Sequence, residues 1–262
     1  MSNPSRADDL RRIESALKLA VDVARRYTPG AVDWEEKSGS GRWDPVTEAD
    51  EAIDQVLREH LPLEGEGWLS EETRDDPSRL GRERVWVVDP LDGTREFVQG
   101  IPEWCISVGL VEQGRPVAGG IVNPVTGELV LGAEGEGVTL NGDPAGGGRS
   151  RSLDGAVVLA SRSEVRRGEW DRFEHAPFEV RPCGSVAYKL ALVAAGLADA
   201  TWTLVPKHEW DVAAGAALAL AAGASVIHGD GSRPSFNRAD PKLPDFLAGE
   251  AELISAFRRD WM

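Results

Sequence analysis

The hydrophobic positions near the start of the chain repeat with the period of a helix. Between residues 7 and 27 they fall on one stripe, which predicts a helix that ends near Tyr27, before Pro29. A second stripe follows Thr47, a residue suited to cap a helix, and Pro62 closes it. The positions expected to face inward are Leu10, Ile13, Leu17, Ala20, Val21 and Ala24 in the first helix and Ile53, Val56, Leu57 and Leu61 in the second. Two amphipathic helices are therefore expected to open the fold.

From residue 84 the pattern changes to short apolar runs of strand length. Four such runs, at residues 84–89, 105–112, 117–123 and 129–133, are separated by segments that include the turn sequences QGRP and PVTGE. Consecutive strands joined in this way usually pair with each other. An antiparallel meander is therefore predicted, and together with the two helices it forms an α+β unit.

A glycine-rich stretch at residues 142–148 precedes a different pattern, in which strands and helices alternate. Strands are predicted at residues 156–161, 178–182, 198–204 and 224–228, with helices at 163–173, 185–196 and 210–222. We therefore place a domain boundary in the glycine-rich stretch. Residues 1–148 are expected to form an N-terminal α+β domain and residues 149–262 a C-terminal α/β domain.

The composition, with 41% hydrophobic and 28% charged residues, is that of an ordinary globular protein. A net charge of −15 argues against nucleic-acid polymers or anionic membranes as partners, because phosphate-rich surfaces are bound by clustered Lys and Arg. The first residues lack an apolar segment and no apolar run could span a bilayer, so a cytoplasmic location is expected. Cys105 and Cys183 have no metal-binding or disulfide spacing and are expected to be buried thiols.

Candidate chemistry begins where the predicted strand 84–89 ends, in the sequence DPLDGT at residues 89–94. Asp89 and Asp92 lie three positions apart on a turn and can face one centre, while the backbone N–H groups of Gly93 and Thr94 can bind an anion beside them. Mg²⁺ prefers such hard oxygen ligands and shares them with substrate phosphates. The segment therefore predicts a metal next to a phosphate, and the alternative is that both acids only cap a turn.

Two further acidic clusters lie at the ends of predicted elements. Glu71 follows a short apolar run in LSEET, and Asp211 begins an alanine-rich helix as part of WD. An acid in the first helical turn also has a purely structural explanation, since it interacts favourably with the helix dipole. Functional sites are nevertheless usually built at such junctions. Four converging acids beside an anion-binding loop favour phosphate chemistry over a glycosidase, which uses two carboxylates and no such loop.

The three motifs together resemble those of the inositol monophosphatase family of metal-dependent, lithium-sensitive phosphatases. LSEET is similar to the family's GEES, DPLDGT to its DPIDGT, and the WD with the helix that follows to its third motif, and the resemblance covers nearly the whole chain. It implies a layered αβαβα sandwich, a homodimer and two or three bound Mg²⁺ ions. The metal ligands that it implies are Glu71, Asp89, Asp92, Asp211 and the backbone carbonyl of Leu91.

The resemblance also implies hydrolysis by a metal-activated water, without a covalent intermediate on the protein. Asp50, Glu71 and Thr94 are the expected catalytic residues, with Thr94, backed by Asp50, orienting and deprotonating the water. Asp50 has a second interpretation, because Thr47 and Asp50 also have the spacing of a capping box. The substrate contacts implied are Gly93, Thr94, Gly184, Ser185, Lys189 and Asp211.

A few positions bear on the substrate. DPLDGTREF resembles the DPLDGTKEF of the CysQ-like 3′(2′),5′-bisphosphate nucleotidases, and Lys189 stands where those enzymes carry a substrate-binding Lys; on base rates it could also be a surface lysine. Leu204 replaces a carboxylate that binds hydroxyl groups in the inositol enzymes, whereas Gly184 and Ser185 resemble the inositol enzymes. The candidates for contact with a non-scissile phosphate are Arg181, Lys189 and Lys207.

We therefore expect a Mg²⁺-dependent phosphomonoesterase of small phosphate esters that acts on 3′(2′),5′-bisphosphate nucleotides. An inositol-1-monophosphatase or another sugar-phosphate phosphatase is the alternative. A different class would be a catalytically inactive relative that binds a metal or a phosphometabolite as a regulator. Such a protein would be expected to lose at least one of the acids, and all of them are present.

Overall fold

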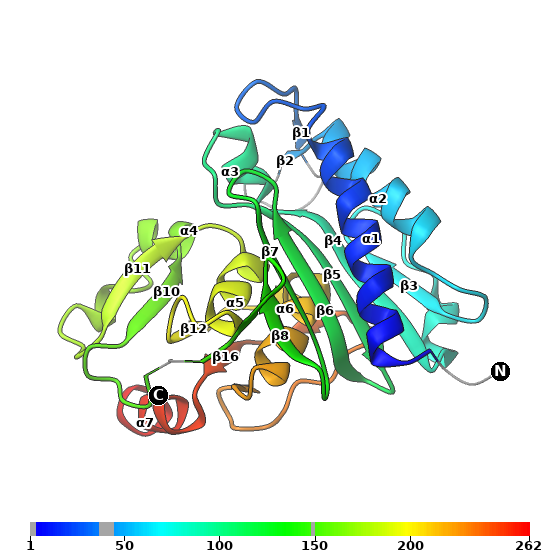
Figure 1. Ribbon diagram of the computed structural model, residues 1–262. Helices are drawn as coiled ribbons and strands as arrows, with labels where there is room; N and C mark the ends of the chain where they lie inside the picture. Colours follow the sequence, from blue (N-terminus) through cyan, green and yellow to red (C-terminus); the bar gives the residue numbers. More distant parts are fainter. Residues whose placement is uncertain (1–3, 37–44, 148–149) are drawn as a thin grey trace.

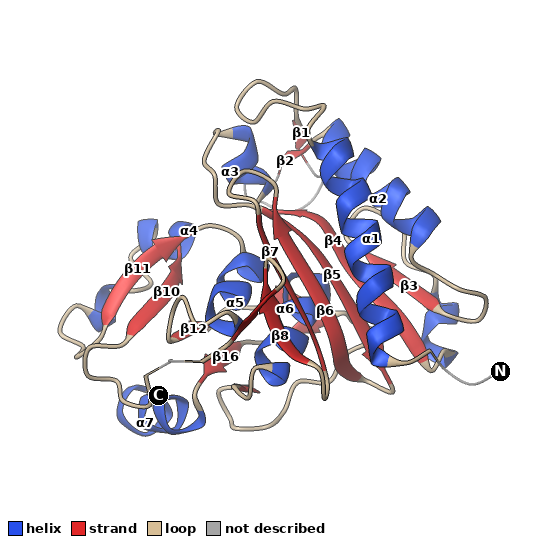
Figure 2. Cartoon of the chain, in the orientation of Figure 1, coloured by secondary structure: helices blue, strands red, loops and turns tan. Residues whose placement is uncertain are grey.

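The computed structural model describes residues 4–36, 45–147 and 150–262. Two main β-sheets alternate with layers of helices, so that the molecule is a sandwich of α, β, α, β and α layers (Figure 1). This arrangement confirms the layered αβαβα fold expected from the motifs. Figure 2 shows that the helices lie outside and between the two sheets.

The helices are α1 (Arg6–Ala24), α2 (Glu48–His60), α3 (Thr94–Val98), α4 (Arg162–Arg166), α5 (Val186–Ala194), α6 (Glu209–Ala221) and α7 (Ala251–Trp261), with 3₁₀ turns at Pro77–Gly81 and Asp171–Phe173. The strands of the first half are β1 (Glu35–Glu36), β2 (Pro45–Val46), β3 (Gly67–Ser70), β4 (Arg84–Asp92), β5 (Cys105–Glu112), β6 (Arg115–Asn123), β7 (Glu128–Ala133), β8 (Gly137–Leu140) and β9 (Asp143–Ala145). Those of the second half are β10 (Val157–Ser161), β11 (Glu179–Cys183), β12 (Ala200–Thr203), β13 (Lys207–His208), β14 (Ser225–Ile227), β15 (Lys242–Leu243) and β16 (Phe246–Gly249).

The first sheet has seven strands in the order β3-β4-β5-β6-β7-β8-β9. The predicted meander is confirmed for β4 to β7, which pair antiparallel with their neighbours, whereas β3 pairs with β4 in parallel. Helices α1 and α2 cover one face of this sheet and share a core with it. Helix α1 ends at Ala24 rather than near Tyr27, and Arg25 caps it.

The second sheet has five strands in the order β11-β10-β12-β16-β14, and β16 runs antiparallel to both of its neighbours. The helix expected at residues 163–173 is wrong as a single element: α4 ends at Arg166, and Gly168, at φ 76°, separates it from a 3₁₀ turn. Strand β16 and helix α7 had not been predicted. Helices α5 and α6 lie between the two sheets, and α7 packs on the outer face of the second sheet.

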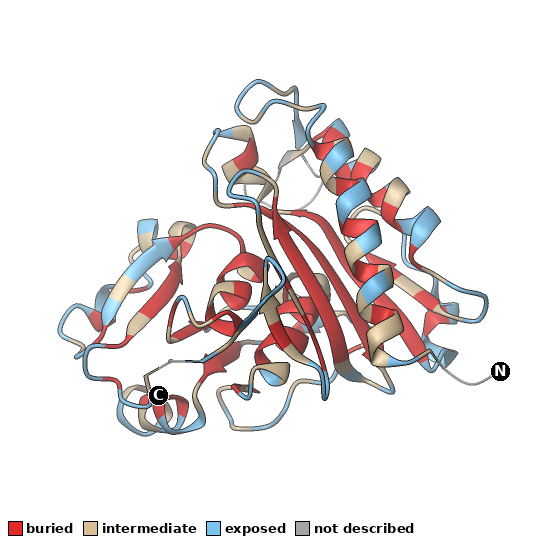
Figure 3. Cartoon of the chain, viewed as in Figure 1, coloured by how far each residue is buried: buried red, intermediate tan, exposed pale blue. Residues whose placement is uncertain are grey.

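Two glycines let helix α6 lie directly on the first sheet. A Cβ added to Gly109 in β5 would come 2.8 Å from the backbone nitrogen of Ala214, and one added to Gly119 in β6 would come 2.5 Å from its carbonyl oxygen. Only residues without a side chain allow this approach. The close packing brings the start of α6, with Asp211, to the end of β4. Figure 3 shows that the central layers of the fold are largely buried.

The boundary that we placed between residues 148 and 149 falls outside the described residues. Every strand of the seven-stranded sheet precedes residue 146, and every strand of the five-stranded sheet follows residue 156. Because α6 belongs to the second half and packs on β5 and β6 of the first, the two halves share a buried interface. The division into two domains therefore stays a prediction.

Candidate functional site

The end of strand β4 carries both acids of the DPLDGT motif. The register with β5 is regular up to Asp89 and breaks between Asp89 and Asp92. The backbone N–H of Leu91 donates to Asp89 Oδ1 at 3.1 Å, and Gly93, at φ 102°, starts helix α3 in a left-handed conformation that favours glycine. This irregular turn aims both carboxylates toward the layer that contains α5 and α6.

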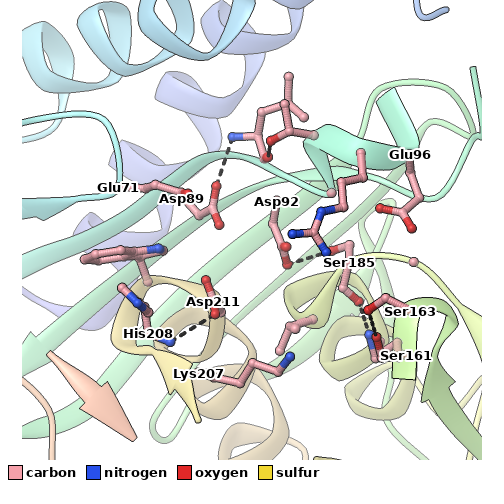
Figure 4. A pocket seen from close by; sticks show the side chains of 18 of the residues that line it. Glu71, Asp89, Asp92, Glu96, Ser161, Ser163, Ser185, Lys207, His208 and Asp211 are labelled. Atoms are coloured by element: carbon pink, nitrogen blue, oxygen red, sulfur yellow. Dashed lines mark hydrogen bonds between the residues drawn. The ribbon is translucent and has the colours of Figure 1, made fainter. Parts of the chain in front are cut away.

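Three carboxylates from distant parts of the chain converge at this point. Oxygens of Glu71, Asp89 and Asp211 all lie within 4.8 Å of one another, an arrangement that could hold a metal ion. Glu71 directly follows β3 and donates its backbone N–H to Val88 in β4, and Asp211 lies in the first turn of α6. Figure 4 shows the three side chains around one space.

Asp92 lies beside this group and is held by α5. Its Oδ2 accepts hydrogen bonds from the Ser185 hydroxyl at 2.7 Å and from the Ala187 backbone N–H at 2.5 Å. Burial raises the pKa of Asp92 in spite of these hydrogen bonds. Asp211 has its pKa raised well above the usual value, first by burial and then by the negative charges of Asp92 and Glu71. A cluster of this kind has excess negative charge that a cation would balance.

Thr94 connects the DPLDGT turn to helix α2. Its hydroxyl lies 3.0 Å from the Leu91 carbonyl oxygen and 3.2 Å from Asp50 Oδ1, and its single proton can go to only one of them at a time. Asp50 is buried, and its other carboxylate oxygen accepts the backbone N–H and the hydroxyl of Thr47 at 2.9 and 2.6 Å. Both interpretations of Asp50 therefore agree with the geometry, because it caps α2 with one oxygen and faces Thr94 with the other.

A cavity of about 340 Å³ opens over these residues. The candidate residues that line it are Glu71, Asp89, Leu91, Asp92, Gly93, Thr94, Gly184, Ser185, Lys189, Lys207 and Asp211. Asp50 is behind Thr94 and is not part of the lining. Arg181 lies on β11, exposed and paired with Glu179 at 3.1 Å, and neither it nor Leu204 lines the cavity.

The sequence analysis missed several lining residues. The lining includes Ser161, the last residue of β10, and Ser163 and Arg167, which follow this strand. Their position at the end of a strand is a signal that could have been used, because ligands often bind there in α/β sheets. The remaining unpredicted members are Arg95, Glu96, Val186, Pro206, His208 and Trp210.

Lys189 is almost completely enclosed. It is 3% exposed, and its ammonium group donates to the Ser185 carbonyl oxygen one helical turn before it. Burial lowers the pKa of Lys189 below its usual value. The alternative of an ordinary surface lysine is therefore wrong, since the residue is buried and lines the cavity.

Comparison with known proteins identifies the family. The sequence model of the inositol monophosphatase family matches residues 8–259. The chain belongs to this family. Members are metal-dependent phosphatases, typically with Mg²⁺, that hydrolyse phosphate monoesters, and this family member is a phosphoric monoester hydrolase.

Relatives within the family have different names. Inositol monophosphatase 3 of Solanum lycopersicum is 33% identical over 237 residues, which is 84% of this chain and 88% of the relative. A 3′-phosphoadenosine 5′-phosphate phosphatase of Mycobacterium bovis is 32% identical over 233 residues, 84% of each chain. The crystal structure of CysQ from Bacteroides thetaiotaomicron is similar with a TM-score of 0.76 at 28% identity, over 94% of this chain and 97% of that one. Among the described residues, no helix is long and apolar enough to cross a membrane.

Proposed function

We propose that this family member is a 3′(2′),5′-bisphosphate nucleotidase, which removes one phosphate from a nucleotide that carries two. The observation that carries the proposal is the division of the cavity into two chemically different walls. Glu71, Asp89 and Asp211 form one wall, and Lys189 and Lys207 line the cavity next to it. A substrate with a scissile phosphate at the acids and a second anionic group at the lysines fits this division.

The acidic wall fits Mg²⁺ by the chemistry of its donors. All of them are hard oxygen ligands, and the buried Ser107 hydroxyl, opposite Asp89 on the neighbouring strand, has no hydrogen-bond partner among the described residues. We propose Glu71, Asp89, Asp92, Asp211 and the Leu91 carbonyl as ligands of two or three Mg²⁺ ions. Bound there, Mg²⁺ would lower the pKa of water and neutralise charge on the phosphate oxygens.

The protein's own contribution is to hold the water and the phosphate. When the Thr94 hydroxyl donates its proton to Asp50 Oδ1, its oxygen is free to accept a proton from the attacking water. Gly93 and Thr94 stand at the start of helix α3 and line the cavity. Their backbone N–H groups are therefore suited to hold phosphate oxygens. Ser185 fixes the orientation of Asp92 through its 2.7 Å hydrogen bond.

An inositol-1-monophosphatase or another sugar-phosphate phosphatase is the second candidate. Gly184 supports it through its resemblance to the inositol enzymes, as does the 33% identity with the tomato inositol monophosphatase 3. Leu204 argues against it, because it replaces a carboxylate that binds hydroxyl groups in the inositol enzymes and a leucine cannot pair with them.

Phosphate release from a panel of substrates tests the proposal. With Mg²⁺ present, kcat/KM for adenosine 3′,5′-bisphosphate is expected to exceed that for inositol 1-phosphate. The reverse order would replace the nucleotidase by the second candidate. No phosphate release from any phosphomonoester would favour the inactive regulator instead.

The homodimer implied by the motifs also belongs to this proposal. Sedimentation equilibrium with and without Mg²⁺ measures the mass directly against the 28.2 kDa of one chain. A mass of one chain under both conditions would exclude the dimer and leave the proposed chemistry unaffected.

A further inference from the structure

Glu164 is a buried acid beside the cavity that the mechanism above does not use. It is 2% exposed and lies in the short helix α4. Its carboxylate accepts hydrogen bonds from Thr203 Oγ1 at 2.8 Å and Trp170 Nε1 at 3.1 Å. These neutral donors hold it at one position within the second half of the fold.

The third partner of this carboxylate is Lys207, whose ammonium nitrogen lies 3.3 Å from Glu164 Oε1. Burial alone would raise the pKa of Glu164, but the charge of Lys207 and the two hydrogen bonds lower it, so the carboxylate is ionised at neutral pH. A charged pair in such a position orients both side chains more strongly than an exposed one.

The backbone of Lys207 is fixed as well. Strand β13, which contains it, pairs antiparallel with β15. The next residue but one, Glu209, is buried and accepts the backbone N–H groups of Asn237 and Arg238 at 2.6 and 3.0 Å. Figure 4 shows the Lys207 side chain entering the cavity from the side of Asp211 and extending toward the wall of Ser161 and Ser163.

Lys189 and Arg167, two other cations that line the cavity, are less suited to meet a second anionic group. Lys189 is 3% exposed and donates to Ser185, whereas the side chain of Lys207 is 17% exposed. Arg167 forms a separate ion pair with Glu169, at 2.6 Å.

The Glu164 carboxylate also keeps Lys207 away from the acidic wall. A lysine has a flexible four-carbon stem, and Lys207 also interacts electrostatically with the carboxyl group of Asp211. Without Glu164, the ammonium group would no longer be held toward the wall of Ser161 and Ser163. With Glu164, it remains available to the substrate at a distance from the scissile phosphate.

We propose that Lys207 binds the second phosphate of the substrate and that Glu164 is the positioning residue that holds Lys207 for this contact. The proposal rests on the proposed nucleotidase function, because only a substrate with two phosphates uses the contact. It names a determinant of substrate choice that lies outside the metal-binding motifs.

The experiment compares two substrates that differ only by the second phosphate: adenosine 3′,5′-bisphosphate and adenosine 3′-monophosphate. Lys207→Met and Glu164→Gln are each expected to raise KM for the bisphosphate roughly tenfold, the effect of losing one charged hydrogen bond. The kcat for the bisphosphate and both constants for the monophosphate should stay within about twofold, because the contact is uniform binding. Lys207→Arg should keep most of the wild-type KM, and Lys18→Met, which removes an exposed ion pair with Glu14 on helix α1, should change nothing.

The outcomes separate the two proposals. If the wild-type enzyme prefers the bisphosphate and Lys207→Met leaves its KM unchanged, the role of Lys207 is wrong and the nucleotidase function stands. If the wild-type enzyme hydrolyses both nucleotides equally well, the nucleotidase function itself fails. Equal losses on both substrates would make the Glu164 pair purely structural, and the Lys207 variants decide this point even if Glu164→Gln folds poorly.

Discussion

Thr94 Oγ1 lies 3.2 Å from Asp50 Oδ1, although 44 positions separate the two residues in the chain. Asp50 does not line the cavity, so any effect on a bound substrate passes through Thr94. Thr47 holds the second carboxylate oxygen of Asp50, which leaves Oδ1 directed at Thr94. This pair couples the start of helix α2 to the DPLDGT turn and gives the Thr94 hydroxyl a carboxylate acceptor for its proton besides the Leu91 carbonyl oxygen.

Thr94→Ala is therefore expected to lower kcat by on the order of 10²-fold, a usual effect of losing general base assistance. KM and the Mg²⁺ concentration for half-maximal rate should change little, since neither depends on the hydroxyl proton. Thr94→Ser retains the hydroxyl and should keep most of the activity. Steady-state phosphate release measures kcat, KM and the Mg²⁺ dependence of the rate. A kcat for Thr94→Ala close to that of Thr94→Ser would exclude a role of the Thr94 hydroxyl in proton transfer.

Asp89→Asn should have opposite effects on activity and on the stability of the metal-free protein. Removing one charge from a group of carboxylates within 4.8 Å of one another relieves repulsion, so the metal-free variant should melt at a higher temperature than the wild type. The same change removes a metal ligand, so turnover and the Mg²⁺-dependent rise in Tm should both be lost. Thermal melts with EDTA and with Mg²⁺ measure this crossover.

Asp76→Asn is a matched control for that experiment. Asp76 is exposed, caps a 3₁₀ turn and does not line the cavity. It should keep the Mg²⁺-dependent rise in Tm and the turnover of the wild type. A rise in Tm with Mg²⁺ that persists in Asp89→Asn would remove Asp89 from the proposed ligands.

The local sequence was sufficient to predict two kinds of element: helices with one buried face, which show an amphipathic stripe, and strands buried on both faces, which show a continuous apolar run. The amphipathic stripe of α1 and the apolar runs of β4 and β5 are examples. Strand β16 was missed because FLAG is short and its burial depends on two neighbouring strands that lie far away in sequence. The break after Arg166 was missed because a single Gly168 ended a helix that the apolar spacing continued.

In the candidate site, the motifs indicated the converging acids but not all of the residues around them. The motifs led to Glu71, Asp89 and Asp211, which the fold brings together. Ser163, just after a predicted strand, could have been found from that position, whereas Glu164 could not, because its role depends on its contact with Lys207, which is distant in sequence. Contacts between residues that are distant in sequence produce no periodic pattern from which they could be predicted.

Gly119→Ala should test whether the packing of α6 sets the position of Asp211. The added Cβ would lie 2.5 Å from the Ala214 carbonyl oxygen, a backbone atom that cannot move without shifting the helix. We expect a loss of about 1–3 kcal/mol in the free energy of unfolding and weaker Mg²⁺ binding. Gly81→Ala is the control, since its Cβ would meet nothing within 4 Å. Urea unfolding and calorimetric titration with Mg²⁺ measure the two effects, and unchanged Mg²⁺ affinity would separate the packing from the site.

Glu66 provides a prediction on pH that is independent of the metal site. It joins α1 to the first sheet by hydrogen bonds with Arg12, with Arg84 at 3.0 Å and with Trp86 at 2.8 Å. Burial alone would raise the pKa of Glu66, but hydrogen bonds from Arg12, Leu63 and Trp86 lower it from 4.5 to about 2. A carboxyl with a lowered pKa stabilises the fold above its unfolded value and loses that contribution as the pH falls toward its folded value.

Glu66→Gln should therefore reduce the free energy of unfolding by roughly 2 kcal/mol at pH 7, the usual effect of weakening hydrogen bonds to a charged group. The difference from the wild type should be constant down to about pH 5, should shrink below the unfolded pKa of 4.5 and should nearly vanish near pH 2. Glu134→Gln, in an exposed pair with Arg115, should differ from the wild type by less than about 1 kcal/mol throughout. Urea unfolding of the three proteins from pH 7 to pH 2 measures the curves. A difference for Glu66→Gln that does not depend on pH would show that Glu66 contributes through packing and not through its charge.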